Sequence, residues 1–209
     1  MTTTRLSILL FAFFFLTSCR RGYKIESGKV YYESWNEGNG HNVFLIDSAD
    51  AKTFKQIEFD CDCDFKFGKD KNHLFIDGEP IKNIDPNTFQ FVGNYVFRDK
   101  DSAYFFGFYT TINDCAIKGV NPDKLELISY PWAKTDKLLV HGFDTLSLSD
   151  VNEFKPINED WGKTKKYVIN GIINQVEILK GADPETFKVI NSFSGKDKRH
   201  TYEFGKIKD

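Results

Sequence analysis

The sequence lacks the motifs that identify most enzyme active sites. It contains no Gly-x-Ser-x-Gly elbow, no phosphate-binding glycine loop and no Gly-x-Gly-x-x-Gly fingerprint. Its four histidines are scattered without the spacing of metal ligands. The 28 basic residues are balanced by 30 acidic ones, so no basic excess favours nucleic acid. We therefore expect no catalytic residue, no metal, no cofactor and no nucleic-acid partner.

No hydrophobic run is long enough for a membrane-spanning helix. The longest, Leu6–Leu16, has 11 residues and follows the single charge of Arg5, as in a signal peptide. It ends in Leu16-Thr17-Ser18-Cys19, which is similar to a bacterial lipobox, whose cysteine is acylated after cleavage just before it. We predict a lipoprotein signal peptide at 1–18 and a lipidated tether at 19–22. An ordinary secretory signal with an unrelated cysteine is the alternative.

Acylation of Cys19 implies a location in the bacterial cell envelope. Several acyl chains on one cysteine anchor a protein stably, whereas a single chain does not. We therefore expect the mature protein to stay on a membrane, which is the outer membrane in a Gram-negative cell.

Cysteine is scarce beyond this position. Cys61, Cys63 and Cys115 are an odd number of thiols, so at least one is unpaired. On one extended strand, the Cα atoms of Cys61 and Cys63 would lie near the upper limit for a disulfide. We therefore expect either Cys61 or Cys63 to pair with Cys115, closing a loop of about 50 residues. A redox or metal-binding Cys-x-Cys site is the alternative.

The stretch Asp60-Cys61-Asp62-Cys63-Asp64 begins like a calcium-binding EF-hand loop. It departs from that pattern where Phe65 replaces the glycine of the turn and Lys71 replaces the bidentate Glu. On a strand, the three carboxylates would share one face and could hold a weakly bound divalent ion. We favour a solvated acidic strand or loop.

One short pattern recurs five times and governs the fold. Each copy has a charged turn, an apolar or aromatic run and then a glycine, as in Leu74-Phe75-Ile76 before Gly78. One copy of this size cannot bury its apolar face alone, so neighbouring copies must share an interior. The repeat glycines are Gly78, Gly107, Gly142, Gly171 and Gly205.

A second marker, Asp-Pro-x-Thr-Phe, lies between the glycines. It occurs at 85–89 and 183–187, with weaker copies at 50–54, 121–125 and 150–154. The distance from the end of a marker to the next glycine is 17 or 18 residues in all but the first copy, which is longer. Constant spacing is typical of packed structure. An Asp that accepts from nearby backbone amides, followed by proline, predicts a helix-like capped turn.

The glycines themselves predict hairpins. Asp77-Gly78 and Asn170-Gly171, each between apolar residues, predict type I′ turns. Each repeat then has about three short strands and one capped turn, over roughly 30–36 residues. We interpret Ser34–His41 as an inserted loop and 196–209 as a C-terminal cap with a charged, protected edge.

At these residues the chain resembles the DKNYY family of bacterial repeat proteins. Asp70-Lys71-Asn72-His73-Leu74-Phe75 is similar to the motif that names the family, although His73 and Leu74 replace its tyrosines. The stretch 180–187 is similar to the second half of the family's repeat. The resemblance covers Tyr23 to the C-terminus. It implies the repeat architecture and assigns no activity.

Together these observations predict an all-β protein. We expect tandem antiparallel β-hairpin repeats with short helical turns in an open array, and propeller-like closure is the alternative. A β-repeat domain of about five to six units fills 23–209. Abundant aromatic residues suit such sheets.

The aromatic residues near the repeat boundaries have two interpretations. The residues concerned are Tyr95, Tyr130, Trp132 and Trp161. All four could form an exposed strip that binds glycan or protein. Alternatively, Trp132 and Trp161, each ten residues before a repeat glycine, are core residues, which the matching position of Phe97 favours.

For the function we predict a non-catalytic, membrane-anchored envelope lipoprotein. Its repeat surface would bind a protein or an envelope polymer such as a glycan. The alternative is an inhibitor or immunity-type lipoprotein that blocks a toxin or enzyme. A hydrolase with an unrecognised site is the third hypothesis.

Overall fold

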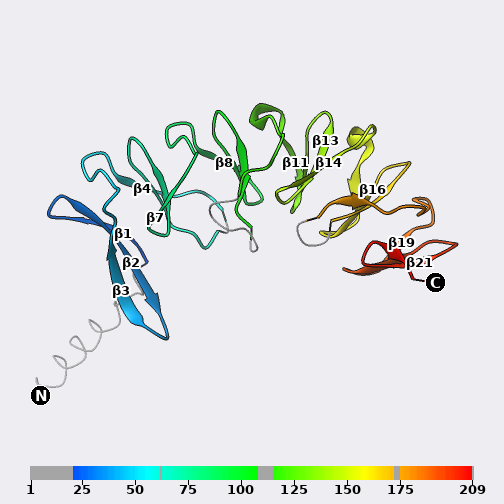
Figure 1. Ribbon diagram of the computed structural model, residues 1–209, viewed down its shortest axis with the longest axis horizontal. Helices are drawn as coiled ribbons and strands as arrows, with labels where there is room; N and C mark the ends of the chain where they lie inside the picture. Colours follow the sequence, from blue (N-terminus) through cyan, green and yellow to red (C-terminus); the bar gives the residue numbers. More distant parts are fainter. Residues whose placement is uncertain (1–20, 62, 108–114, 172–174, 209) are drawn as a thin grey trace, which may run out of the picture. The chain divides into compact units, whose positions relative to one another are not determined.

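The computed structural model describes residues 21–61, 63–107, 115–171 and 175–208. They are mostly strands and turns, arranged as six small antiparallel sheets that follow one another along the chain (Figure 1). Within these ranges, strands pair only inside their own sheet, and no sheet closes into a barrel. The predicted fold class, an all-β open series of tandem hairpin repeats with short helical turns, is confirmed. The predicted signal peptide and Cys19 lie outside the described residues.

The described chain forms two compact bodies. The first contains the chain up to Glu58 together with Asp64–Pro86, and the second contains Phe59–Cys63 and Asn87–Asp209. No helix in the described ranges is both long enough and apolar enough to cross a membrane.

The first body contains two sheets. The first sheet consists of β1 (Gly22–Glu26), β2 (Lys29–Asn36) and β3 (Gly40–Leu45). The second consists of β4 (Lys55–Ile57), β5 (Phe67–Lys69), β6 (Leu74–Ile76) and β7 (Glu79–Ile81).

The second body contains four sheets. The third sheet has β8 (Gln90–Gly93), β9 (Val96–Arg98) and β10 (Ala103–Phe105), and the fourth has β11 (Glu126–Ser129), β12 (Trp132–Lys134), β13 (Leu138–His141) and β14 (Asp144–Ser147). The fifth has β15 (Lys155–Pro156), β16 (Trp161–Lys163), β17 (Val168–Asn170) and β18 (Glu177–Ile178), and the sixth has β19 (Lys188–Asn191), β20 (Ser194–Lys196), β21 (Thr201–Glu203) and β22 (Lys206–Ile207). Two 3-10 turns, η1 (Pro122–Lys124) and η2 (Val151–Glu153), precede the fourth and fifth sheets.

Most repeats therefore have four strands rather than the predicted three. The additional strand is the second of each four-stranded sheet; it has three residues and lies before the charged turn, as in β16 (Trp161–Lys163) and β20 (Ser194–Lys196). A strand of two or three residues is too short for hydrophobic alternation to reveal it.

The turn predictions are right at one Asp/Asn-Gly pair and wrong at the other. Asp77 and Gly78 have φ values of 50° and 89°, as the two central residues of a type I′ turn require. Asn170 is instead the last residue of β17, and Gly171 is not in the left-handed region. Gly171 is required for space, because a Cβ there would lie 2.5 Å from Cδ2 of His141 in the preceding repeat.

The remaining repeat glycines differ in the same way. Gly142 and Gly205 have φ values of 60° and 74°, whereas Gly107 is not left-handed and is packed against the Phe105 ring. Phe204 precedes Gly205 with φ of 49°, so an aromatic residue occupies a type I′ position that normally favours Asn or Asp.

The charged turn before each apolar run is built around one buried or half-buried side chain. In the second sheet, Asp70 Oδ1 accepts from the backbone amides of Asn72 and His73, both at 2.7 Å. Its Oδ2 accepts from the amide of Asp50 at 2.8 Å, 20 residues earlier. One carboxylate thereby connects the charged turn to the Asp-Pro type turn. Sequence analysis identified the charge of this turn but not its role.

Equivalent side chains accept hydrogen bonds from the backbone amides of the charged turn in the other repeats. Asp197 accepts from the amides of Arg199, His200 and Asp183 at 2.7–2.8 Å. Asp99 accepts from the amides of Asp101 and Ser102, and Thr135 and Thr164 use hydroxyl oxygens to accept from the amides two and three residues on. His73 and His200 therefore lie at the end of this turn, just before the strand.

The predicted capped turn is confirmed at 50–54, 121–125 and 183–187, whereas at 150–154 the Asp150 side chain makes no cap hydrogen bond. Asp50 Oδ1 accepts from the amide of Lys52 at 3.1 Å, and Asp183 Oδ1 accepts from that of Glu185 at 3.1 Å. Asn121 caps η1 by accepting from the amide of Asp123. The short polar side chain thus satisfies a backbone donor that the turn leaves free.

Successive repeats are joined by a basic side chain at the end of the second strand of a repeat. In three repeats its charged end donates to the proline carbonyl oxygen of the next Asp-Pro or Asn-Pro turn. The pairs are Lys69 with Pro86 at 2.7 Å, Arg98 with Pro122 at 3.0 Å, and Lys163 with Pro184 at 2.9 Å.

Two tryptophans join repeats in a similar way. Trp132 Nε1 donates to the Asn158 carbonyl oxygen at 2.8 Å, and Trp161 Nε1 donates to those of Asn191 and Ser192 at 3.1 Å. The two side chains are 1 % and 0 % exposed. The core interpretation is confirmed for Trp132 and Trp161, and the exposed-strip interpretation is wrong for both.

Tyr95 and Tyr130 also belong to the interior rather than to a strip. Both are half-buried, their ring centroids are 5.4 Å apart, and both pack against the cluster around Phe105 and Val140.

A glycine in the second strand of three repeats makes room for the marker phenylalanine. A Cβ on Gly68 would lie 2.5 Å from Cζ of Phe54 and 3.1 Å from Cζ of Tyr23. The space beside Gly162 is occupied in the same way by the Phe154 ring, and that beside Gly195 by the Phe187 ring. In the fourth sheet the pair changes together: Ala133 replaces the glycine and Leu125 replaces the phenylalanine, within one cluster.

This pairing predicts the effect of Gly68→Ala. The added methyl group should overpack the interior and destabilise the protein by about 1–3 kcal/mol. Combining it with Phe54→Leu should recover part of the loss, so the double variant should be more stable than the sum of the single changes predicts. Urea unfolding of the four proteins measures this. Gly38→Ala is the control, because its Cβ would meet only Asn36 Oδ1, at 3.5 Å.

A second prediction concerns the ionised state of Asp70. Burial alone would raise the pKa of this carboxyl, but the amides of Asp50, Asn72 and His73 lower it below its ordinary value. The contribution of the Asp70 carboxylate to the free energy of unfolding is therefore fully present above the unfolded pKa of about 3.9. It is lost as the pH falls through the lower pKa of the folded protein. Asp70→Ala should cost roughly 3 kcal/mol at neutral pH, because buried amides lose their acceptor.

The pH dependence separates this explanation from a simple loss of packing. The stability gap between wild type and Asp70→Ala should narrow in acid below about pH 4. Exposed Glu79→Ala is the matched carboxylate control and should change stability little. A gap that stays constant down to acid pH contradicts the role of the carboxylate.

Candidate functional site

The segment predicted to be an inserted loop is a β-hairpin. Trp35 pairs with His41 and Asn36 pairs with Gly40, so β2 and β3 continue almost to the tip. Asn36 Oδ1 accepts from the amide of Asn39 at 2.7 Å, and Gly40 has φ of 67°, which together reverse the chain tightly. The glycine-rich sequence thus marks the tip of a long hairpin rather than an irregular insertion.

This hairpin exposes large apolar side chains. Trp35, Val43 and Phe44 are 47 %, 51 % and 56 % exposed. The register places Trp35 and Val43 on one face of the sheet and Phe44 on the other. Trp35 differs from Trp132 and Trp161, which are buried. We call this exposed set of residues the hairpin patch.

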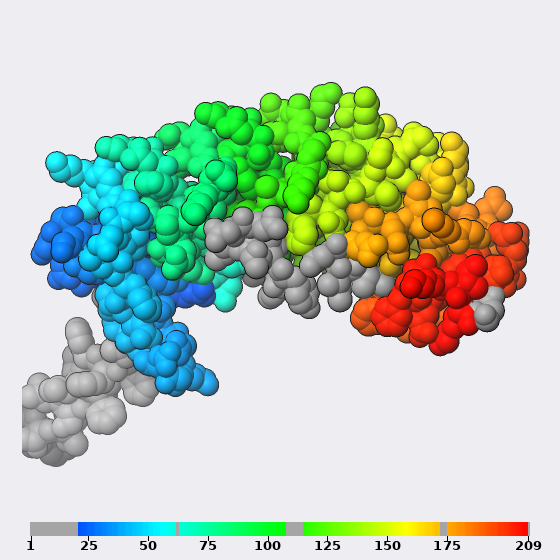
Figure 2. Space-filling model, viewed as in Figure 1, coloured from blue at the N-terminus to red at the C-terminus, as the bar shows by residue number. Residues whose placement is uncertain are grey.

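A groove of about 600 Å³ lies in the first body beside the hairpin. Figure 2 shows the surface of the hairpin itself, in lighter blue at the lower left. One wall comes from β2 and β3, with Tyr32, Phe44 and Ile46, and the other comes from the β6–β7 turn, with Asp77 and Glu79. The groove combines apolar walls with carboxylates, so it suits a partner segment that is partly apolar.

A polar cluster forms one end of this groove. Arg21 makes an ion pair with Asp77 at 2.9 Å and donates from Nε to the Tyr32 hydroxyl at 3.1 Å. The Tyr32 hydroxyl donates to Asp77 at 2.7 Å. Burial, together with this hydrogen bond, raises the pKa of Tyr32 to about 12. Burial also raises the pKa of Tyr23, so neither phenol supplies a base or nucleophile at neutral pH.

A second groove, of about 510 Å³, lies in the second body. It is lined by Lys155, Lys163 and Lys165 together with Glu153 and Glu185. Lys163 is engaged by the Pro184 carbonyl oxygen, and Lys165 pairs with Glu153 at 3.3 Å. Most of the positive charge of this groove is therefore used within the protein.

The histidines occupy separate surroundings. His141 Nε2 lies 2.9 Å from the Glu159 carbonyl oxygen, and its ring packs 4.4 Å from the Trp132 ring centroid. Burial lowers the pKa of His141, which keeps the imidazole neutral. His41 approaches Glu33 at 3.8 Å. In the described part of the chain, no three His, Cys, Asp or Glu residues are grouped as a metal site would require.

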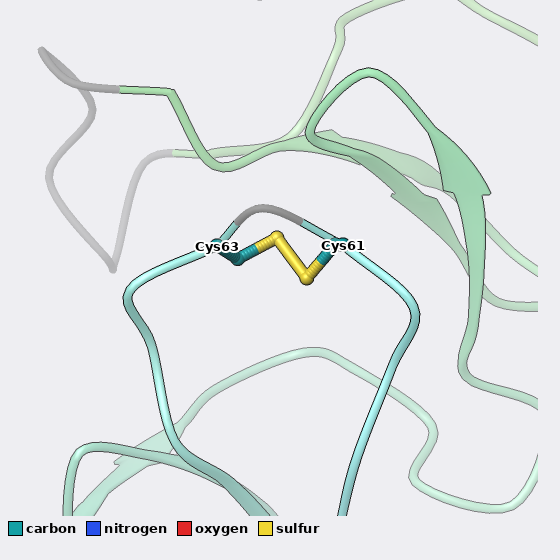
Figure 3. The surroundings of a disulfide bond; sticks show 2 residues. All are labelled: Cys61 and Cys63. Carbon is teal, nitrogen blue, oxygen red and sulfur yellow. A yellow bond between two sulfur atoms is a disulfide. The ribbon is translucent and has the colours of Figure 1, made fainter.

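The predicted disulfide is corrected. Cys61 is bonded to Cys63, with Cα atoms 5.1 Å apart (Figure 3), and Cys115 is a buried thiol, 4 % exposed. The prediction assumed an extended strand, but the chain bends at Asp60 and Cys61, and this brings the Cα atoms well within bonding range. The acidic stretch is therefore not a strand. Asp62 lies outside the described residues.

The segment that carries this disulfide is the extra length of the first repeat. Phe59 packs edge-on against Phe89 and Phe97, with ring centroids 5.8 and 5.3 Å away. The insertion thus contributes one aromatic side chain to the interior of the second body.

The thiols provide a direct test of this correction. Peptide mapping of oxidised mature protein without reduction should recover Cys61 and Cys63 in one closed peptide. A thiol-alkylating reagent should label Cys115 only after unfolding, because the folded protein buries it. Cys115→Ala should leave the Cys61–Cys63 bond intact. A peptide linked to Cys115 in the wild type contradicts the assignment.

Comparison with known proteins supports the repeat architecture. The model of the DKNYY family matches residues 23–206. No curated protein matches the chain, and no solved structure does. Since the match spans all six sheets and most of the sequence, the chain belongs to the DKNYY family.

Proposed function

We propose that the mature protein is a non-catalytic lipoprotein of the bacterial cell envelope, which presents its repeat surface to a protein or an envelope polymer. The observation that carries this proposal is the sequence around Cys19. An apolar run too short to span a membrane leads into Leu16-Thr17-Ser18-Cys19, the pattern that precedes acylation of a cysteine.

The use of the recurring polar residues supports a binding role rather than catalysis. Asp70, Asp197 and Thr164 accept backbone amides inside turns, and Lys69 and Lys163 donate to proline carbonyl oxygens. These groups satisfy the backbone of the repeats. A surface built by repetition is well suited to extended binding.

The groove of the first body is the strongest candidate for the contact with a partner. Its tyrosine, Tyr32, is hydrogen-bonded and stays protonated, so the groove would recognise a ligand by shape, apolar contact and the charge of Asp77 and Glu79. Capture of one stoichiometric protein from solubilised envelope would favour the inhibitor hypothesis. Enrichment of glycan or of several proteins would favour a scaffold.

Substitution of Cys19 tests the anchor. Cys19→Ala should move the protein from the membrane fraction to the soluble fraction and abolish incorporation of a labelled fatty acid, since no other thiol follows a lipobox. Fractionation and metabolic labelling measure both effects. Cys115→Ala is the matched cysteine control and should remain on the membrane. Unchanged partitioning of Cys19→Ala would refute lipidation.

A further inference from the structure

The β2–β3 hairpin, which carries the hairpin patch, projects from the end of the first sheet at which the chain enters. Gly22, the first residue of β1, pairs with Glu33, which in turn pairs with Val43. The β2–β3 pairing continues for three more residues, from Ser34 to Asn36, past the start of β1 (Figure 1). At about 3.3 Å per residue, the tip extends roughly 10 Å beyond the level of Gly22.

The tether between the sheet and the proposed lipid is equally short. Cys19 precedes Gly22 by three residues, which span at most about 10 Å when fully extended. Arg21 shortens the free part further, because it forms ion pairs with Asp64 at 3.1 Å and Asp77 at 2.9 Å. An acylated Cys19 would therefore hold the bilayer surface within reach of the hairpin tip.

The chemistry of the hairpin suits the boundary between lipid and water. Tryptophan is enriched at this boundary, where its ring is partly apolar and its N–H finds a polar partner. The patch adds Val43 and Phe44 as apolar side chains. Residues 30–51 contain no Lys or Arg, so attraction to anionic headgroups plays little part.

We propose that the β2–β3 hairpin lies against the membrane that holds the anchor, with Trp35, Val43 and Phe44 in the interfacial layer. The proposal rests on the proposed acylation of Cys19. The hairpin then adds a second, non-covalent contact that fixes how the first body is oriented on the membrane. Because the contact is apolar, it should persist in high salt and on zwitterionic lipid.

Trp35 is a built-in reporter for this contact. Trp132 and Trp161 are buried, so the difference in fluorescence between wild type and Trp35→Phe isolates the signal of Trp35. The acylated full-length mature protein is reconstituted into phosphatidylcholine vesicles with and without a nitroxide-labelled lipid. Trp35 should be quenched by the nitroxide lipid and should be about two-fold less accessible to acrylamide than in soluble Cys19→Ala protein.

Matched substitutions test whether the hairpin patch makes the contact with the membrane. Val43→Asp combined with Phe44→Asp should restore the access of acrylamide to Trp35 on vesicles. Phe204→Asp, at a position 63 % exposed in the sixth sheet, should not. Protein that floats with vesicles but keeps Trp35 fully accessible overturns the hairpin contact and leaves the anchor standing. Wild-type protein that does not float overturns both.

Discussion

The hydrogen bonds of one side chain in each charged turn organise the backbone of each repeat. Asp70 accepts three backbone amides from two turns that are 20 residues apart. An unpaired amide in the interior is costly, so each turn requires this acceptor to fold against its neighbour. A hydroxyl does the same within the charged turn at Thr135 and Thr164, which explains why the position varies in charge but always accepts a hydrogen bond. The recurring sequence thus serves first to give the backbone amides of each turn a hydrogen-bond acceptor.

The contacts between repeats show why a single repeat is an incomplete unit. Trp161 is buried only because it lies in one cluster with Phe187 of the following repeat, and its N–H needs the carbonyl oxygens of that repeat. Lys163 likewise finds its acceptor at Pro184. Each repeat therefore contributes donors and aromatic rings that its successor completes. Nearest-neighbour dependence of this kind is the property that makes a repeat protein cooperative over several units.

The sequence predicted the fold class but not the interactions that produce it. Asp77-Gly78 revealed its turn because two left-handed residues have a strong sequence preference. The type I′ turn predicted at Asn170-Gly171 was wrong because Gly171 instead provides space for His141, which lies 30 residues away in the chain. The glycines of Ser34–His41 obscure the strand pattern, so this hairpin was predicted to be a loop. A disulfide from Cys61 or Cys63 to Cys115 was predicted because the local bend that joins Cys61 to Cys63 is invisible in sequence. Local geometry could be predicted, and contacts between distant residues could not.

The choice between carboxylate and hydroxyl gives the chain an uneven sensitivity to acid. Hydrogen bonds from backbone amides lower the pKa of Asp70 in the second sheet and of Asp197 in the sixth, although burial opposes this in both. Thr135 and Thr164, in the fourth and fifth sheets, do not titrate in this range. Protonation therefore weakens the charged turns of the second and sixth sheets and spares those of the fourth and fifth. In a strongly acidic medium the charged turns of the second and sixth sheets should therefore loosen before those of the fourth and fifth.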